Sequence, residues 1–163
     1  MTPNERAFLE MLSVSEGTST SPATKNAGYD VIVTGIDGQP EILTDYSTHP
    51  FANGRAPKVI NSAGLVSTAS GRYQFLVKYW QFYKNELKLS DFSPESQDEW
   101  ALTLIAECNA TNDINSGLLA SAIEKCSSRW ASLPGSQYGQ PQQKIATLYN
   151  AYQSVGGTLS HTA

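Results

Sequence analysis

The sequence predicts an α+β fold that is mostly helical, with a small antiparallel β-hairpin near the N-terminus. Apolar residues recur at helical spacing through most of the chain, whereas β-rich runs are confined to residues 29–46. The composition, 40% hydrophobic and 16% charged, is ordinary for a globular protein. At 163 residues the chain can form one domain or two small lobes that share a core, and length alone does not separate these. Such a chain buries roughly two thirds of its unfolded surface, so it needs no disulfide or metal for stability.

The first predicted helix starts at the N-terminus and ends at a glutamate. Thr2 and Glu5 form a Thr-x-x-Glu capping box, and the proline between them suits the first helical position. Phe8, Leu12 and Glu16 recur at spacing four and therefore share one face of the helix. A glycine follows Glu16 as a stop signal. A carboxylate thus lies in line with an apolar face, at the end of a helix.

The next segment changes to a β pattern. The runs YDVIVTG and EILTDYS are separated by Asp37-Gly38 and a proline, which predicts a hairpin over residues 29–46. Residues 48–70 are rich in Pro, Gly, Asn and Ser and show no clear periodicity. Because long ordered loops are usually functional, we expect this loop to contribute to a site.

Helices dominate the remainder of the chain. The run Ser93-Pro94-Glu95 is an N-cap signature with an acid in the first turn. The spacing of apolar residues predicts helices over residues 71–89, 94–108, 119–130 and 141–155. Trp80, Trp100 and Trp130 fall at core positions of these helices, so we expect them to be buried rather than to bind a ligand.

The charge and the termini exclude several partners. The formal net charge is −4 with no basic cluster, which argues against nucleic acid and against electrostatic adhesion to anionic wall polymers. The N-terminus has no basic segment followed by an apolar one, so we expect no secretory signal. No apolar stretch is long enough to span a bilayer, so we expect no membrane partner.

The sequence also contains no clear motif for metal binding or nucleophilic catalysis. The two histidines are His49 and His161, and neither belongs to an H-E-x-x-H motif or stands near a C-x-x-C pair. A catalytic triad would have to be built on His49. Cys108 and Cys126 lie within helical patterns, and we expect two buried apolar thiols. We therefore expect no metal and no cofactor.

Glu16 is the strongest candidate for chemistry. On an apolar face it loses hydration, which raises its pKa, and the negative end of the helix dipole acts in the same direction. A carboxylic acid that is protonated near neutral pH can donate a proton to the leaving oxygen of a glycoside. The alternative is a structural glutamate that caps backbone groups or pairs with a surface arginine.

Hydrolysis of a glycosidic bond usually requires a second carboxylate. Asp30 and Asp45 flank the predicted hairpin and are the candidates by position, although both occupy places where Asp commonly satisfies the backbone of a turn. If neither serves, the sugar must supply the nucleophile. In peptidoglycan the C6 hydroxyl of muramic acid can attack C1 intramolecularly, with a large effective molarity.

Long motifs match the lambda-type phage endolysins in order and spacing. The matching segments are AFLEMLSVSEGT, NAGYDVIV, LTDYS-x-HP, SGRYQFL, LSDFSPESQD and WASLPGSQYGQ. They extend from about residue 6 to residue 157, nearly the whole chain. The chain therefore resembles this family closely. The resemblance implies a lysozyme-like fold over residues 1–163, a single catalytic domain with two lobes around a cleft, one side of which is the small sheet. It implies no separate cell-wall-binding domain.

The resemblance also implies an activity and site residues. Members of the family are lytic transglycosylases that cleave the β-1,4 bond between N-acetylmuramic acid and N-acetylglucosamine and leave a 1,6-anhydromuramic end. The S-E-G-T match makes Glu16 the catalytic acid/base, with no indispensable second carboxylate. The G-R-Y-Q and Y-G-Q matches imply four substrate-binding residues, Tyr73, Gln74, Tyr138 and Gln140. Tyr138 also stands out because helical packing does not explain it. Residues 48–67 and 133–142 correspond to two loops that close over the substrate.

The same resemblance implies a biological setting. The partner is the glycan strand of peptidoglycan, and the role is host lysis. Without a secretory signal, the enzyme, expected to be a monomer, would wait in the host cytoplasm. It would reach the periplasmic wall only after a holin opens the membrane.

Two departures from the family pattern leave alternatives open. The segments TGIDGQPEILTD and FANGRAPKVINSAGLVSTA are longer than in the family, so sugar contacts from this region are not carried over. The pI of about 5.1 differs from the basic character common in wall-lytic enzymes. The alternative functions are a hydrolytic muramidase that uses Asp30 or Asp45, and a non-catalytic glycan-binding or virion module that kept the fold.

Overall fold

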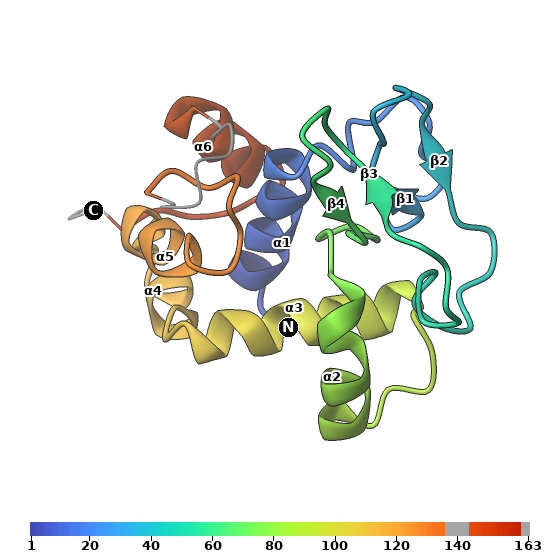
Figure 1. Cartoon of the computed structure of the whole chain (residues 1–163). Helices are drawn as coiled ribbons and strands as arrows, with labels where there is room; N and C mark the ends of the chain where they lie inside the picture. The colour runs from blue at the N-terminus through green and yellow to red at the C-terminus, as the bar shows by residue number, and fades with distance from the viewer. Residues whose placement is uncertain (136–143, 161–163) are drawn as a thin grey trace. The chain divides into compact units, whose positions relative to one another are not determined.

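The computed structural model describes residues 1–135 and 144–160. It has the predicted α+β character, and Figure 1 shows its helices and short strands in chain order. The chain divides into two compact units. The first, called the terminal unit here, comprises residues 1–16 and 101–163, and the second, the central unit, comprises residues 17–100.

Helix α1 (Pro3–Ser15) opens the terminal unit and starts with the predicted capping box. The backbone N–H of Glu5 donates to Thr2 Oγ1 at 3.1 Å, and the backbone N–H of Thr2 donates to Glu5 Oε1 at 3.4 Å. Phe8 and Leu12 on the predicted apolar face are completely buried. The helix therefore forms for the reasons that its sequence indicates.

Among the described residues of the terminal unit, three further helices lie wholly within it: α4 (Thr111–Asn115), α5 (Leu119–Cys126) and α6 (Ile145–Ser154). Helix α1 packs against α6 and α4 (Figure 1). Asn4 joins three segments, because its Nδ2 donates to the Ile114 carbonyl oxygen at 2.9 Å and its Oδ1 accepts the N–H of Thr158 at 3.1 Å. The sequence did not predict α4, and α5 is shorter than the predicted helix over residues 119–130.

Helix α3 (Pro94–Glu107) has residues in both units. Its N-terminus carries the predicted cap, since the Ser96 N–H donates to Ser93 Oγ at 3.3 Å. Trp100, in the central-unit half of the helix, is buried.

The central unit contains two small antiparallel sheets where the sequence predicted one. Strands β1 (Val31–Ile32) and β2 (Glu41–Ile42) form the predicted hairpin, with Val31 opposite Ile42. Strands β3 (Lys58–Val59) and β4 (Val66–Ser67) form the second sheet, with Val59 opposite Val66. The second hairpin lies within residues 48–70. Its strands are two residues long, too short for an alternating pattern to be visible in the sequence.

The predicted helix over residues 71–89 is wrong over residues 71–76. Residues 70–75 instead form a tight turn, in which the N–H and carbonyl groups of Ser70 and Phe75 exchange hydrogen bonds of 3.0 and 2.8 Å. Gly71 and Gln74 have φ values of +85° and +55°, which a right-handed helix cannot include. The helical part consists of η1 (Val77–Tyr79) followed by α2 (Trp80–Leu87).

An aromatic core holds the central unit together. The Phe75 ring stacks on the Trp100 indole with 3.9 Å between centroids and 6° between planes. Trp80 meets Phe92 edge-on at 5.5 Å, and the His49 ring lies 5.0 Å from Phe92. These contacts confirm that Trp80 and Trp100 are core residues, and Trp130 is likewise buried in the terminal unit.

Candidate active site at Glu16

Glu16 lies at the C-terminal end of α1, where the sequence predicted it. Its N–H donates to the Leu12 carbonyl oxygen at 2.9 Å, and its backbone is still helical, with φ −79° and ψ −7°. Gly17 then takes φ +73°, a left-handed conformation that ends the helix. The Glu16 residue is half-buried. Its carboxyl group is therefore partly desolvated, yet part of the residue remains open to a ligand.

The surroundings of Glu16 favour its protonated form. Burial raises the pKa of the Glu16 carboxyl to about 7, and a hydrogen bond with the Ser132 side chain opposes this rise. Within the described part of the chain, no charged side chain contributes to the shift. Near neutral pH the carboxyl is thus divided between its protonated and ionised forms. A residue that acts first as a general acid and then as a general base needs this condition.

One serine hydroxyl is hydrogen-bonded to this carboxyl, and a second serine hydroxyl is hydrogen-bonded to the first. Ser132, in the turn after α5, is hydrogen-bonded to the Glu16 side chain. The Ser132 and Ser15 hydroxyl oxygens are 2.7 Å apart, although 117 positions separate them in the chain. Glu16 therefore meets a hydroxyl, rather than the arginine partner that one interpretation of the sequence allowed. Neither serine was predicted from the sequence, because a contact between such distant residues leaves no spacing signal, although Ser132 stands inside the WASLPGSQYGQ motif.

The segment that follows Glu16 is held inside the central unit. Thr18 Oγ1 donates to the Arg72 carbonyl oxygen at 2.6 Å, and Thr18 is buried. Gly28 has φ +91°, and a Cβ atom there would lie 2.7 Å from the backbone nitrogen of Ser19. Only glycine permits this close approach, which places residues 18–19 against residue 28.

Asp30 and Asp45, the candidates for a second carboxylate, both satisfy local groups. Asp30 is buried and accepts hydrogen bonds from the Thr24 hydroxyl and, at 2.9 Å, from the Lys25 N–H. Asp45 is exposed and accepts the Ser47 N–H at 2.9 Å, and this hydrogen bond lowers the pKa of Asp45. The Asp45 contact is the ordinary one of Asp in a turn, whereas Asp30 binds groups five and six positions earlier in its own loop.

Tyr73 lies in a buried polar network. The residue is only 1% exposed, and its hydroxyl donates to Asp98 Oδ1 at 2.6 Å and accepts from Arg72 Nη1 at 3.1 Å. The Tyr29 hydroxyl donates to the same Asp98 oxygen at 2.8 Å. The sequence analysis did not single out Arg72 or Asp98. The visible role of Tyr73 is to connect the turn of residues 70–75 to the start of α3, and its contact with a substrate stays a prediction.

Gln74 is half-buried and sits in the turn, so its predicted position one turn into a helix is wrong. Its Nε2 donates to the carbonyl oxygens of Gly71 at 2.9 Å and Val31 at 3.2 Å. Its φ of +55° is uncommon for a residue other than glycine, and such strained residues are frequent at functional sites. Its role in substrate binding stays a prediction. Tyr138 and Gln140 lie outside the described residues.

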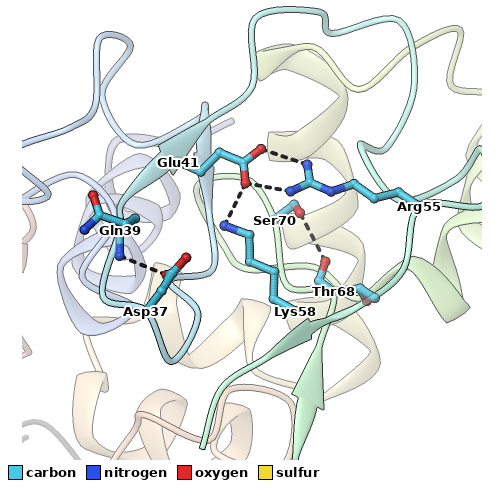
Figure 2. A network of polar contacts seen from close by, with 7 residues as sticks. All are labelled: Asp37, Gln39, Glu41, Arg55, Lys58, Thr68 and Ser70. Carbon is cyan, nitrogen blue, oxygen red and sulfur yellow. Dashed lines mark hydrogen bonds and ion pairs between the residues drawn. The ribbon is translucent and has the colours of Figure 1, made fainter.

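An ion-pair cluster orders part of the loop that the sequence singled out. The Arg55 guanidinium binds both Glu41 carboxylate oxygens, at 2.8 and 2.6 Å, and Lys58 Nζ lies 2.7 Å from one of them (Figure 2). Arg55, whose hydrogen bond is the largest cause, and Lys58 together lower the pKa of Glu41 to about 2. The Arg55 guanidinium also lies over the Phe51 ring, 4.7 Å from its centre. The loop of residues 51–58 is thereby tied to strand β2.

Residues 1–135 and 144–160 contain neither a metal-binding cluster nor a membrane-spanning helix. Among them, no group of three or more His, Cys, Asp or Glu side chains is arranged to hold a metal ion. No helix in these ranges combines the length and the apolar character that a membrane crossing requires.

Comparisons with known proteins place the chain in a family. Residues 6–159 match the family model named Endolysin. The endolysin of Escherichia phage P2 is 55% identical over 154 residues, covering 94% of this chain and 93% of that protein. The endolysin of Escherichia phage lambda is 46% identical over 155 residues, covering 94% and 92%.

Solved structures agree with the sequence relatives. Bacteriophage lambda lysozyme in complex with a chitohexasaccharide matches with a TM-score of 0.87 and 44% identity, over 98% of this chain and 97% of that one. A second structure of lysozyme from bacteriophage lambda matches with a TM-score of 0.83 and 42% identity over the same shares. The chain has the α+β fold of lambda lysozyme and belongs to the Endolysin family.

Proposed function

We propose that this chain is a lytic transglycosylase that cleaves the β-1,4 bond between N-acetylmuramic acid and N-acetylglucosamine in bacterial peptidoglycan. The observation that carries the proposal is Glu16, a half-buried carboxyl whose pKa is raised to about 7 at the end of α1. Membership of the Endolysin family supports peptidoglycan as the substrate. We take residues 1–163 as one catalytic domain.

In the proposed mechanism, the protonated Glu16 carboxyl donates its proton to the glycosidic oxygen as the bond from that oxygen to C1 of muramic acid breaks. The C6 hydroxyl oxygen of the same sugar forms a new bond to C1, and its proton passes to the Glu16 carboxylate. The acid is thus regenerated, no water is consumed, and the product carries a 1,6-anhydro ring. An intramolecular nucleophile needs no second carboxylate to activate it.

The contacts of Asp30 and Asp45 support this route over hydrolysis. Asp30 already accepts two hydrogen bonds from its own loop, and Asp45 is engaged in a surface turn. A general base in an inverting enzyme, or a nucleophile in a retaining one, would need a carboxylate aimed at the sugar. Hydrolysis by a muramidase that uses one of these residues is the alternative activity.

For the substrate site we propose Gln74, Tyr73, Tyr138 and Gln140 as glycan contacts. The lambda lysozyme relative was solved with a chitohexasaccharide, which supports glycan binding by this fold. We propose that this chain also binds chitohexaose and does not cleave it, because chitin lacks the lactyl-bearing muramic unit. Titration calorimetry with chitohexaose, followed by chromatography of the incubated sugar, tests both parts. Rapid release of shorter chitin oligomers would contradict the second.

For the biological role we propose host lysis by a monomer that is released from the host cytoplasm through a holin-dependent opening of the membrane. The measurement that tests the chemistry is mass spectrometry of purified murein after digestion. Anhydro ends weigh one water less than the reducing ends that hydrolysis gives. Products without the anhydro mass would replace the transglycosylase with the muramidase.

The variant Glu16→Gln separates an enzyme from a non-catalytic glycan-binding or virion module. We expect the turbidity loss of outer-membrane-permeabilised cells to slow by at least about a hundredfold, as is typical when a general acid is removed. Glu10→Gln, a change of the same kind within α1, is the matched control and should retain activity. Equal lysis rates for Glu16→Gln and the wild type would discard the Glu16 mechanism.

A further inference from the structure

Ser132 contacts both the Glu16 carboxyl and the Ser15 hydroxyl at the end of α1. Its side chain is hydrogen-bonded to the Glu16 carboxyl, and its oxygen is 2.7 Å from the oxygen of Ser15. Ser15 is the last residue of α1 and is 3% exposed, so water does not compete freely for its hydroxyl. The three side chains therefore form a short chain of polar groups in the order Ser15, Ser132, Glu16.

The hydrogen bonds that join Ser15, Ser132 and Glu16 can run in either direction. A serine hydroxyl donates one hydrogen bond and accepts up to two. When Glu16 is ionised, Ser132 can donate to the carboxylate while it accepts from Ser15. When Glu16 is protonated, the carboxylic acid can donate to Ser132, which then donates to Ser15. The contact between Ser132 and Glu16 therefore survives in both protonation states. A lysine or a backbone N–H can only donate, so it could not accept a hydrogen bond from the protonated acid.

We propose that Ser132 is a positioning residue for Glu16, oriented by Ser15, and that these two hydroxyls hold the carboxyl in place through both proton transfers of the reaction. The inference rests on the proposed function, because it assumes that Glu16 alternates between acid and base. It names residues that the endolysin motifs did not single out. Ser132 would not touch the substrate in this role, and it would act through Glu16.

The contribution of Ser132 can be measured as a change in the pKa of Glu16. Within the described residues, burial and the Ser132 hydrogen bond are the two causes that displace the pKa of Glu16, and they act in opposite directions. Removal of the Ser132 hydroxyl leaves burial unopposed, so the pKa should rise further. A typical hydrogen bond corresponds to about half to one pH unit of such a rise.

The test is a titration of Glu16 followed by the ¹³Cδ chemical shift in NMR, together with the pH dependence of kcat/KM on purified murein. Ser132→Ala should raise the Glu16 pKa by about half a unit or more and lower kcat by about three- to tenfold. Ser132→Thr keeps a hydroxyl and should restore most of both values. Ser15→Ala leaves Ser132 in place and should give a smaller change in the same direction.

Ser127→Ala is the matched control. The Ser127 hydroxyl is also buried in the terminal unit, but it donates to the Glu124 carbonyl oxygen at 2.7 Å. Its loss should affect stability as Ser132→Ala does and leave the titration of Glu16 unchanged. A Glu16 titration in Ser132→Ala that coincides with the wild type would overturn the inference.

The role of Glu16 and the role of Ser132 can be disproved separately. If Glu16→Gln lyses cells at the wild-type rate, the proposed Glu16 mechanism is wrong, whatever the NMR titration shows. If Glu16→Gln is inactive while Ser132→Ala leaves the Glu16 titration unmoved, the function stands and the role of Ser132 is wrong.

Discussion

His49 Nε2 lies 2.8 Å from the backbone carbonyl oxygen of Phe75, inside the aromatic core of the central unit. The Nδ1 atom of the same ring accepts the N–H of Phe51 at 3.2 Å. This arrangement requires the neutral imidazole, with the proton on Nε2, and burial lowers the pKa of His49 to about 4. The residue is thus a structural histidine that joins residue 49 to the turn of residues 70–75.

The first prediction concerns acid stability. An unfolded histidine binds a proton below about pH 6.5, whereas the folded His49 does so only near pH 4, so protons favour the unfolded chain in that window. The stability that His49 contributes should be complete above pH 6.5 and should decrease by up to about 3 kcal/mol as the pH falls to 4. Urea unfolding of His49→Gln and the wild type measures this, because the difference between them cancels other titrating groups. A difference that is constant across the window would contradict the prediction.

The second prediction is that Glu16 destabilises the fold at alkaline pH. Its folded pKa of about 7 lies above the ordinary value of 4.5, so the folded chain holds the proton more tightly than the unfolded chain between these values. The relative stability that this carboxyl provides is present below pH 4.5 and is lost as the pH rises through 7. Glu16→Gln should therefore match the stability of the wild type near pH 4. At pH 8 its free energy of unfolding should be higher by about 1–2 kcal/mol, after allowance for the partial exposure of Glu16, and it should melt at a higher temperature.

Glu5, on the same helix, supplies a control of opposite sign. The Asn115 amide, which donates to Glu5 Oε2 at 2.7 Å, is the largest cause of the lowered pKa of Glu5. Its ionised form stabilises the fold, so Glu5→Gln should lose stability at pH 8. Equal melting temperatures for Glu16→Gln and the wild type at pH 8 would show that the Glu16 carboxyl is not desolvated as described.

The third prediction compares two glycines. Gly71 and Gly38 both have left-handed φ values, +85° and +71°. A Cβ atom at Gly71 would lie 2.4 Å from Gln97 Oε1 and 2.9 Å from the Phe92 ring, whereas a Cβ atom at Gly38 would meet nothing within 4 Å. Gly38→Ala should therefore cost only the backbone strain, about 1 kcal/mol, and Gly71→Ala should cost about 1–3 kcal/mol more. Thermal unfolding measures both, and equal losses would show that the turn of residues 70–75 can move away from α3.

These contacts explain why the sequence predicted some elements and not others. The capping box of α1 and the face that ends at Glu16 are local patterns, and both are confirmed. The turn of residues 70–75 follows from a long-range requirement, namely that the Gln97 side chain accepts the Arg72 N–H at 2.9 Å and donates to the Tyr29 carbonyl oxygen at 3.1 Å. An apolar spacing that continues from Tyr73 to Leu87 hides this turn, because tertiary contacts override the local helical pattern.

The candidate site likewise combines a residue that the sequence predicts with one that only the folded structure reveals. Glu16 stands out because it breaks an apolar face, and the motif around it identifies the family. The role of Ser132 is visible only in the folded chain, because a hydroxyl in a turn is ordinary in sequence and becomes informative when it meets a half-buried carboxyl.

The last prediction concerns the two cysteines, Cys108 and Cys126, which we expected from the sequence to be buried apolar thiols. Cys126 is completely buried, but Cys108 is only half-buried, so the description is wrong for the second thiol. A hydrogen bond from the Cys126 thiol lowers the pKa of Cys108 to about 6. Cys108 thus has the lowered pKa of the two half- or fully buried thiols, while the hydrogen bond with Cys108, together with burial, raises the pKa of Cys126.

Iodoacetamide at pH 7 should therefore alkylate Cys108 in the folded protein and leave Cys126 unmodified until the chain unfolds. Cys126→Ala removes the donor, so the pKa of Cys108 should rise and its alkylation should slow by several-fold to tenfold. Cys126→Ser keeps a donor of similar size and is the matched control, with a rate closer to the wild type. Peptide mass spectrometry of timed samples gives each rate separately. Equal labelling of both thiols before unfolding, or an unchanged rate in Cys126→Ala, would show that the thiol pair does not share a proton in solution.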